Sequence, residues 1–156
     1  MGLTRTDPPT VAELETEAAS LSLSQFNDET ALRLGLILID LGEGLPVVIN
    51  IRTANRTLFH VSLPGAAANN ENWARRKSNT TLMFGASSLL VGTRHREKGE
   101  LLARHGLDLA DYADHGGAVP LVVPNVGMVA VATVSGLPQV EDHRLVVRAV
   151  EALIAQ

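Results

Sequence analysis

The sequence of 156 residues contains no cysteine, and only 3% of its residues are aromatic. Without cysteine the chain can form no disulfide, no thiolate nucleophile and no cysteine-based zinc or iron-sulfur site. With so few aromatic residues the core must be mainly aliphatic, and a flat cofactor finds few rings on which to stack. Composition alone therefore gives little support for a cofactor.

The sequence also lacks a basic excess and a long apolar run. Seventeen acidic and 13 basic residues give a net charge of -4, the wrong sign for a general binder of nucleic-acid phosphates. Residues 1–17 carry charges and two prolines rather than a secretory signal, and no apolar run is long enough to span a bilayer. We predict a cytoplasmic protein with neither nucleic-acid nor membrane partners, and a flexible segment at residues 1–9.

Several catalytic motifs are absent as well. The chain has no Walker A sequence, no Gly-x-Gly-x-x-Gly and no His-Glu-x-x-His, so the usual sequence evidence for nucleotide or zinc-protease chemistry is missing. The nucleophile elbow Gly-x-Ser-x-Gly fails at residues 85–89, which read GASSL. A hydrolase that uses Ser135 with His143 would need another geometry, and we keep it only as a minor alternative.

The residues that are present predict one α+β domain over residues 1–156. Apolar periodicity predicts helices, whereas β-rich runs between turn residues predict two antiparallel strand pairs. The run at 126–134 is apolar on both faces, which requires helices on both sides of the sheet. The predicted helices span 11–21, 28–41, 69–84 and 87–97, with a closing helix from Glu141 or Asp142; the predicted strands span 47–51, 59–63, 119–123 and 126–134.

Two segments stand apart from this regular pattern. The helix at 28–41 has hardly a polar face, so we expect it to be buried, either in the core or in a subunit contact. The charged stretch 99–114 is interrupted by Gly106 and forms either a short helix with a loop or a flap.

Three histidines recur at intervals of ten residues: His95, His105 and His115. Ten helical steps rotate the chain by about 280°, and Gly106 intervenes, so the three cannot share one helical face. Scattered, locally hydrogen-bonded histidines are the plainer interpretation. A ligand role for His115 stays open because Gly116 and Gly117 follow it, which permits either a sharp turn or close approach by a ligand or neighbouring subunit.

Two further clusters have both a structural and a functional interpretation. Asp142 and His143 lie at a predicted helix start. In the structural interpretation the carboxylate caps the helix. In the functional interpretation both side chains share a cleft with Ser135. The basic run Arg75-Arg76-Lys77 has a structural interpretation as a solvated helix face. Its functional interpretation is a clamp for a carboxylate or phosphate group, or a set of salt bridges across an oligomer interface.

Four ordered segments resemble the UPF0303 group of the haem-degrading, GlcG/HbpS-like domain superfamily. They read NWARRKSNT at 72–80, FGASS at 84–88, YADHGGAVP at 112–120, and VSGLPQ at 134–139 followed by Asp142-His143. The resemblance runs from about Leu14 to the C-terminus. It implies a profilin-like three-layer α/β/α fold with a five-stranded antiparallel sheet, assembled into dimers and larger rings or cages.

Functions diverge among the proteins that share this resemblance. HbpS-type relatives bind haem and some degrade it, relatives in glycolate and propanediol operons have less certain roles, and a fungal member associates with protein-targeting machinery. The resemblance marks a candidate ligand site, but no single motif of the superfamily fixes the haem ligand. For bound haem we expect His115 or His143 as the axial ligand of the iron, with Arg76 and Lys77 on the propionates. The full candidate set is Arg76, Lys77, Asn79, His115, Gly116, Gly117, Ser135, Asp142 and His143.

Two hypotheses follow for the function. The first is a homo-oligomer that binds haem or another anionic small molecule near a subunit boundary. The second is a non-catalytic oligomeric interaction module, in which the motif residues maintain the sheet, the turns and the assembly. Substitution of His115 or His143 should abolish ligand binding under the first hypothesis, whereas it should alter only stability or assembly under the second.

Overall fold

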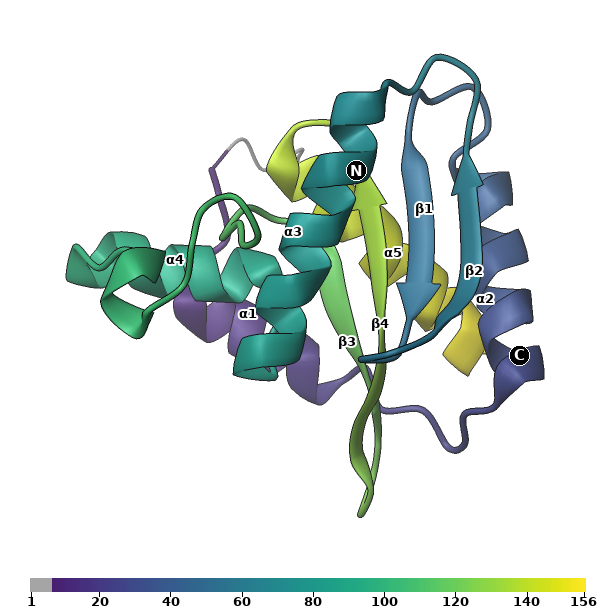
Figure 1. The fold of residues 1–156 in the computed structure, drawn as a ribbon. Helices are drawn as coiled ribbons and strands as arrows, with labels where there is room; N and C mark the ends of the chain where they lie inside the picture. The colour runs from purple at the N-terminus through teal and green to yellow at the C-terminus, as the bar shows by residue number, and fades with distance from the viewer. Residues whose placement is uncertain (1–6) are drawn as a thin grey trace.

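Four antiparallel strands form a single sheet in the computed structural model, which describes residues 7–156 (Figure 1). The strand order is β2-β1-β4-β3, so two sequential hairpins lie side by side and β1 pairs with β4. The strands are β1 (Val48–Arg52), β2 (Thr57–Ser62), β3 (Ala118–Val123) and β4 (Gly127–Ser135). The predicted α+β class and both predicted hairpins are confirmed.

Five α-helices and one 3-10 helix complete the described fold. They are α1 (Val11–Ala19), α2 (Asp28–Leu41), α3 (Ala68–Phe84), α4 (Ser88–Lys98), the 3-10 helix η1 (Leu102–His105) and α5 (Gln139–Ile154). The predicted start of α2 is confirmed, because the Asn27 side chain accepts a hydrogen bond from the Thr30 backbone N–H at 2.9 Å. In the ambiguous stretch 99–114, the structure forms a short helix with a loop.

The sheet is the middle layer of three, as Figure 1 shows. Helices α2 and α5 pack together against one face, and α3 crosses the other face against β4, β3 and β1. Strand β4 therefore has helices on both sides, and its residues 130–135 are all buried, as their two-sided apolar pattern predicts. Helix α4 contacts α3 and β3, and α1 packs on α4.

The predicted fifth strand is absent from the described residues, so that part of the fold prediction is wrong. The segment between α1 and α2 meets the edge of β3 at a single parallel bridge, Ser22 to Val122. The Leu23 backbone N–H donates to the Val122 carbonyl at 2.8 Å, but no ladder follows. Leu21 and Leu23 enter the core on either side of this contact, and the burial of their side chains, rather than strand pairing, holds the segment.

Two other helices differ in part from expectation. Within the single chain α2 is buried on one side only, because Leu32 and Leu36 are 51% and 52% exposed, and the alternative of a subunit contact stays a prediction. Helix α5 begins at Gln139 after Pro138, two to three residues before the predicted start, so Asp142 lies inside the first turns and does not cap the helix. The predicted flexible segment 1–9 falls largely outside the described residues.

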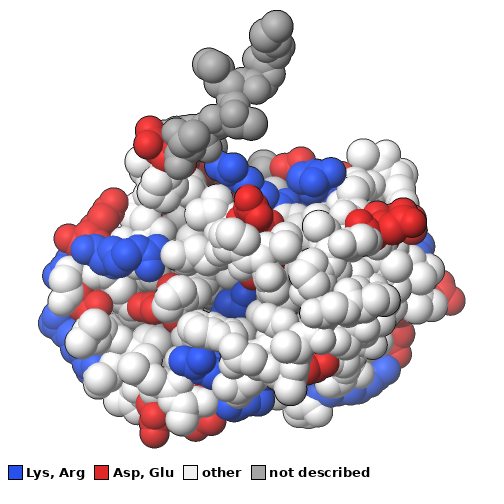
Figure 2. All heavy atoms as spheres, turned by 90° about the horizontal axis from the view of Figure 1, so that it is seen from above, with Lys and Arg blue, Asp and Glu red and all other residues white. Residues whose placement is uncertain are grey.

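The surface carries charge of both signs. On the face seen in Figure 2, acidic and basic side chains lie mainly around the margin and uncharged residues occupy most of the centre. Within residues 7–156, no helix combines the length and the hydropathy needed to cross a bilayer.

Candidate functional site

A small cleft lies where α3, the loop before β3, the end of β4 and the start of α5 meet. Its volume is about 220 Å³, and Trp73 and His115 line it. We call it the Trp73–His115 cleft. Five of the nine predicted site residues line it: Lys77, His115, Gly116, Ser135 and Asp142. Three of the four family motifs, which are far apart in the sequence, thus converge here, whereas the FGASS motif lines another cavity.

Lys77 forms the buried floor of this cleft and is saturated with acceptors. Its Nζ donates to the Gly116 carbonyl at 3.0 Å and to the Val134 carbonyl at 2.9 Å, and it pairs with Asp142 Oδ2 at 3.1 Å. An ammonium has three hydrogens to donate, and all three have acceptors here. Lys77 therefore joins α3 to the loop before β3, to β4 and to α5, and has no donor left for a ligand.

Asp142 is the anionic partner in this buried pair. Both side chains are 3% exposed, so burial lowers the pKa of Lys77 and raises the pKa of Asp142, while each charge opposes the shift of the other. The carboxylate also accepts the backbone N–H groups of Leu137 at 2.9 Å and Gly136 at 3.3 Å. These bonds to the charged form offset its desolvation and fix the turn between β4 and α5.

The two glycines before β3 allow this packing. Gly117 has φ +139°, and a Cβ built on it would lie 2.4 Å from Lys77 Nζ and from the Val134 carbonyl. A Cβ on Gly116 would lie 2.5 Å from the Gln139 carbonyl. The sequence left open whether these glycines form a sharp turn or permit close approach by a ligand or a neighbouring subunit. The structure shows a close approach, but the approaching groups belong to the same chain.

His115 differs from these scaffold residues because its side chain is 50% exposed. Its ring meets the Trp73 ring edge to face, with centroids 5.1 Å apart, and its Nδ1 lies 3.7 Å from Asp114 Oδ1. Burial lowers the pKa of His115; Asp114 opposes that shift, and Arg96, Lys77 and Arg76 reinforce it. The imidazole is consequently neutral near pH 7, with a lone pair available to a ligand.

Arg76 places a cation beside the same aromatic ring. Its Cζ lies 4.5 Å from the centroid of the Trp73 ring, and its Nε donates to the Leu109 carbonyl at 2.8 Å. A guanidinium stacked in this way keeps donors for an anion, because it has five N–H groups.

His143 lies in a different cavity. Its ring is 4% exposed, its Nε2 lies 2.6 Å from Glu17 Oε1 on α1, and its Nδ1 is buried without a partner. Together with Leu14 and Phe84, it lines a cavity of about 300 Å³ between α1, α4 and β3. The two histidines that the resemblance marked therefore do not share a cleft, even though Asp142 and His143 are neighbours in sequence.

Asn79 also lies apart, in a broad polar hollow of about 750 Å³ formed by β1, β2 and α3. Its side-chain amide donates to the Asp111 carbonyl at 2.8 Å, and its Oδ1 accepts from Arg52. Asn50 contributes a buried Oδ1 without a partner. The sequence reasoning missed this hollow because it treated the hairpin and α3 as separate elements.

The hydrolase arrangement is not formed. Ser135 is 2% exposed, and no hydrogen bond joins it to His143 in the described structure. Asp142, the acid next to His143 in the sequence, is occupied by Lys77 and two backbone N–H groups, and His143 contacts Glu17 instead. The serine thus lacks the base that its activation requires.

Fold and sequence now define a class of protein. A family model for HbpS-like haem-degrading proteins matches residues 26–151, so the chain belongs to the HbpS-like family. Within it, the chain is a UPF0303 protein: a UPF0303 protein of Streptomyces coelicolor is 46% identical over 95% of this chain and 96% of its own length.

Solved structures agree with this assignment. The crystal structure of the Ybr137w protein superposes with a TM-score of 0.87 at 30% identity, covering 95% of this chain and 90% of that one. A PduOC structure described as a haem complex superposes with a TM-score of 0.69 at 16% identity, covering 81% of this chain and 94% of that one. At that identity, the second likeness concerns the fold alone.

Proposed function

We propose that this HbpS-like protein binds an anionic small molecule at the Trp73–His115 cleft, with haem as the first candidate. The family match and the haem complex of a structural neighbour support the choice of haem. The proposal concerns binding, and it assigns no reaction.

One observation carries the proposal: the half-exposed His115 imidazole, whose pKa is lowered by burial, stands at a cleft whose buried Lys77 and Asp142 already bond to each other and to the backbone. The lowered pKa of His115 means that no proton need leave before it coordinates iron. Arg76, stacked on Trp73, is the cation available to a propionate. Lys77 is not available to a propionate, because its side chain is 3% exposed and its ammonium is fully bonded. This differs from the propionate contact that the sequence analysis expected of Lys77.

The size of the cleft limits how haem can fit. Its volume of about 220 Å³ lies below the roughly 300–1,000 Å³ of pockets that enclose a ligand of drug size. His115 fits the role of axial ligand, but this chain does not enclose a tetrapyrrole by itself. We therefore propose that a second copy supplies the remaining wall in a homo-oligomer built from dimers. Bound haem would supply an iron centre for ligand or redox chemistry.

A haemin titration tests this proposal. Trp73 is the only tryptophan in the chain, so its fluorescence reports on this cleft directly. We expect haemin to quench Trp73 saturably and to shift the Soret band. His115→Ala should abolish the Soret shift, whereas His143→Ala should keep it because His143 lies in another cavity. His60→Ala, at a partly exposed histidine on β2, is the surface control.

Iron-free protoporphyrin separates recognition of the anionic ring from iron ligation. Under the proposal it still quenches Trp73 in the His115→Ala variant, and Arg76→Gln weakens that quenching. An unaltered Soret shift in His115→Ala would contradict the proposed ligand. If wild type gives no saturable response to haemin, haem is excluded as the ligand of this cleft.

The interaction module remains a second candidate because of α2. Leu32 and Leu36 are each about half exposed and lie one turn apart on this helix, so they are neighbours on its outer face. Their position supports a contact with another copy of the chain. Under this candidate, Leu32→Glu with Leu36→Glu lowers the mass measured by light scattering, while haemin produces no specific response.

A further inference from the structure

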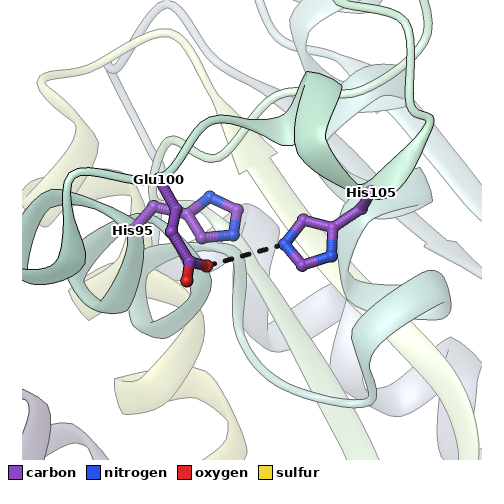
Figure 3. Close-up of side chains that lie close together, drawn as sticks. All are labelled: His95, Glu100 and His105. Atoms are coloured by element: carbon purple, nitrogen blue, oxygen red, sulfur yellow. Dashed lines mark ion pairs between the residues drawn. The ribbon is translucent and has the colours of Figure 1, made fainter.

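A second group of ligand-type side chains gathers at the C-terminal end of α4. His95 lies in the last turns of that helix, Gly99 ends it in a left-handed conformation with φ +66°, and Glu100 follows directly. The chain then turns back through η1, which ends at His105. Figure 3 shows the three side chains facing one another, with one ligand atom from each within 4.8 Å of the others.

His95 is held in the orientation that a metal ligand needs. Its side chain is 6% exposed, and its Nδ1 lies 3.0 Å from Asp114 Oδ2. If Nδ1 donates this hydrogen bond, the Nε2 lone pair is left free, which is the carboxylate-histidine-metal arrangement of many metal sites. Gly92 allows the approach, because a Cβ there would lie 1.9 Å from the Asp114 carbonyl.

Glu100 is oriented as well. Its Oε1 accepts from Arg104 Nη1 at 3.2 Å, while Oε2 lies 3.8 Å from His105 Nε2. The His95 and His105 rings stack with centroids 5.4 Å apart, and the Phe84 ring packs edge-on against both. The cluster thus has an apolar wall on one side, and it stays accessible because His105 is 37% exposed.

We propose that His95, Glu100 and His105 bind one divalent transition-metal ion, with zinc as the preferred metal. Two imidazoles and one carboxylate are a donor set of zinc sites that keep a fourth position open, whereas magnesium and calcium favour oxygen ligands throughout. Zinc bond lengths place tetrahedral ligand atoms about 3.4 Å apart. The 3.8 Å between Glu100 Oε2 and His105 Nε2 needs only a small closure, whereas the ligand atoms that lie up to 4.8 Å apart and the near-parallel histidine rings require side-chain rotation toward a shared ion. Among residues 7–156, this is the one place where three such side chains meet.

The site has a structural consequence. A bound ion would tie the loop that follows α4 back onto the helix, across the reversal at Gly99. The fourth position would face solvent, open to water or to a donor from another molecule. The three ligands do not include the proposed haem ligand His115, although Asp114 lies beside both His95 and His115.

Calorimetry on the chelator-treated full-length protein tests the site. We expect Zn²⁺ to bind with one ion per chain, and Co²⁺ to give the visible absorption of a site with nitrogen and oxygen ligands. His105→Ala and Glu100→Gln should each weaken Zn²⁺ binding by more than about tenfold, with circular dichroism unchanged. Asp114→Asn should weaken it by about 10–100-fold and keep the Co²⁺ spectrum, as expected for a positioning residue.

His60→Ala is the matched control. His60 pairs with Glu71 at 2.8 Å, and its side chain is 37% exposed, like that of His105, but no third ligand-type group joins the pair. This variant should bind Zn²⁺ as wild type does. The proposal is overturned if wild type gives no heat above the buffer blank, if Ca²⁺ competes equally with Zn²⁺, or if His105→Ala and Glu100→Gln bind as tightly as wild type.

Discussion

The Lys77–Asp142 pair and the His95–Glu100–His105 cluster are built in opposite ways. The first is buried, and each of its donors and acceptors is used within the chain. The second is partly open and has ligand atoms that face one another without bonding closely. Three of the four family motifs contribute to the first region, whereas His95, Glu100 and His105 of the second lie outside all four motifs. Residues that carry a family resemblance can thus be architectural, and open ligand chemistry can lie elsewhere.

The largest effect that this contrast predicts comes from breaking the buried pair. Lys77→Met leaves the Asp142 carboxylate buried without its cation, and we expect a loss of about 3–5 kcal/mol in the free energy of unfolding. Urea denaturation measures it. The double variant Lys77→Met, Asp142→Asn should recover part of the loss, because no buried charge remains. A Lys77→Met protein as stable as wild type would contradict the architectural role.

A smaller loss is expected at Gly117. An alanine there must adopt φ +139° and place its Cβ 2.4 Å from Lys77 Nζ, so we expect strain of about 1–3 kcal/mol plus displacement of the pair. Gly44→Ala is the matched control, since Gly44 has φ +79° with open space around its Cβ position. Thermal unfolding compares the two, and an equal loss at both positions would show that contact with Lys77 does not matter.

The smallest effect is a pH dependence from His115. Burial and the cations Arg96, Lys77 and Arg76 lower its pKa, and Asp114 opposes them, so the folded state binds fewer protons than the unfolded state. Stability from this source is present above about pH 6.5 and is lost as the pH falls below it. Urea denaturation at about pH 7.5 and about pH 5.5 measures the difference. His115→Gln should reduce this difference in stability. A wild-type protein that is more stable at the lower pH than at the higher one would contradict the prediction.

Most of the secondary structure could be predicted because its signals are local. Apolar periodicity predicted the range 28–41 that α2 has in the structure, and β-rich runs between turn residues located both hairpins. The fifth strand was wrong because it came from the resemblance alone, and the segment around Ser22 makes one bridge only. The start of α5 was placed too late because Pro138, which has no capping side chain, precedes the helix.

The candidate site was only partly predictable, because its contacts depend on tertiary structure. The motifs contain Lys77, His115 and Asp142, and the structure places these three residues at one cleft. They could not separate His143 from that place, since consecutive residues on α5 face different cavities. His95 and His105 cannot share one face of a single helix, as their spacing predicts. The chain reverses at Gly99, however, and this reversal stacks the two rings, which helical spacing does not reveal.

Buried motif residues build a scaffold, and we propose that His115 presents the ligand chemistry at its edge. The haemin titration with Trp73 fluorescence and Soret absorbance tests this division most directly. We expect wild type and His143→Ala to bind haemin with the same Soret shift, and His115→Ala, folded and of unchanged mass, to show none. A shift lost in His143→Ala but kept in His115→Ala would contradict the proposed ligand.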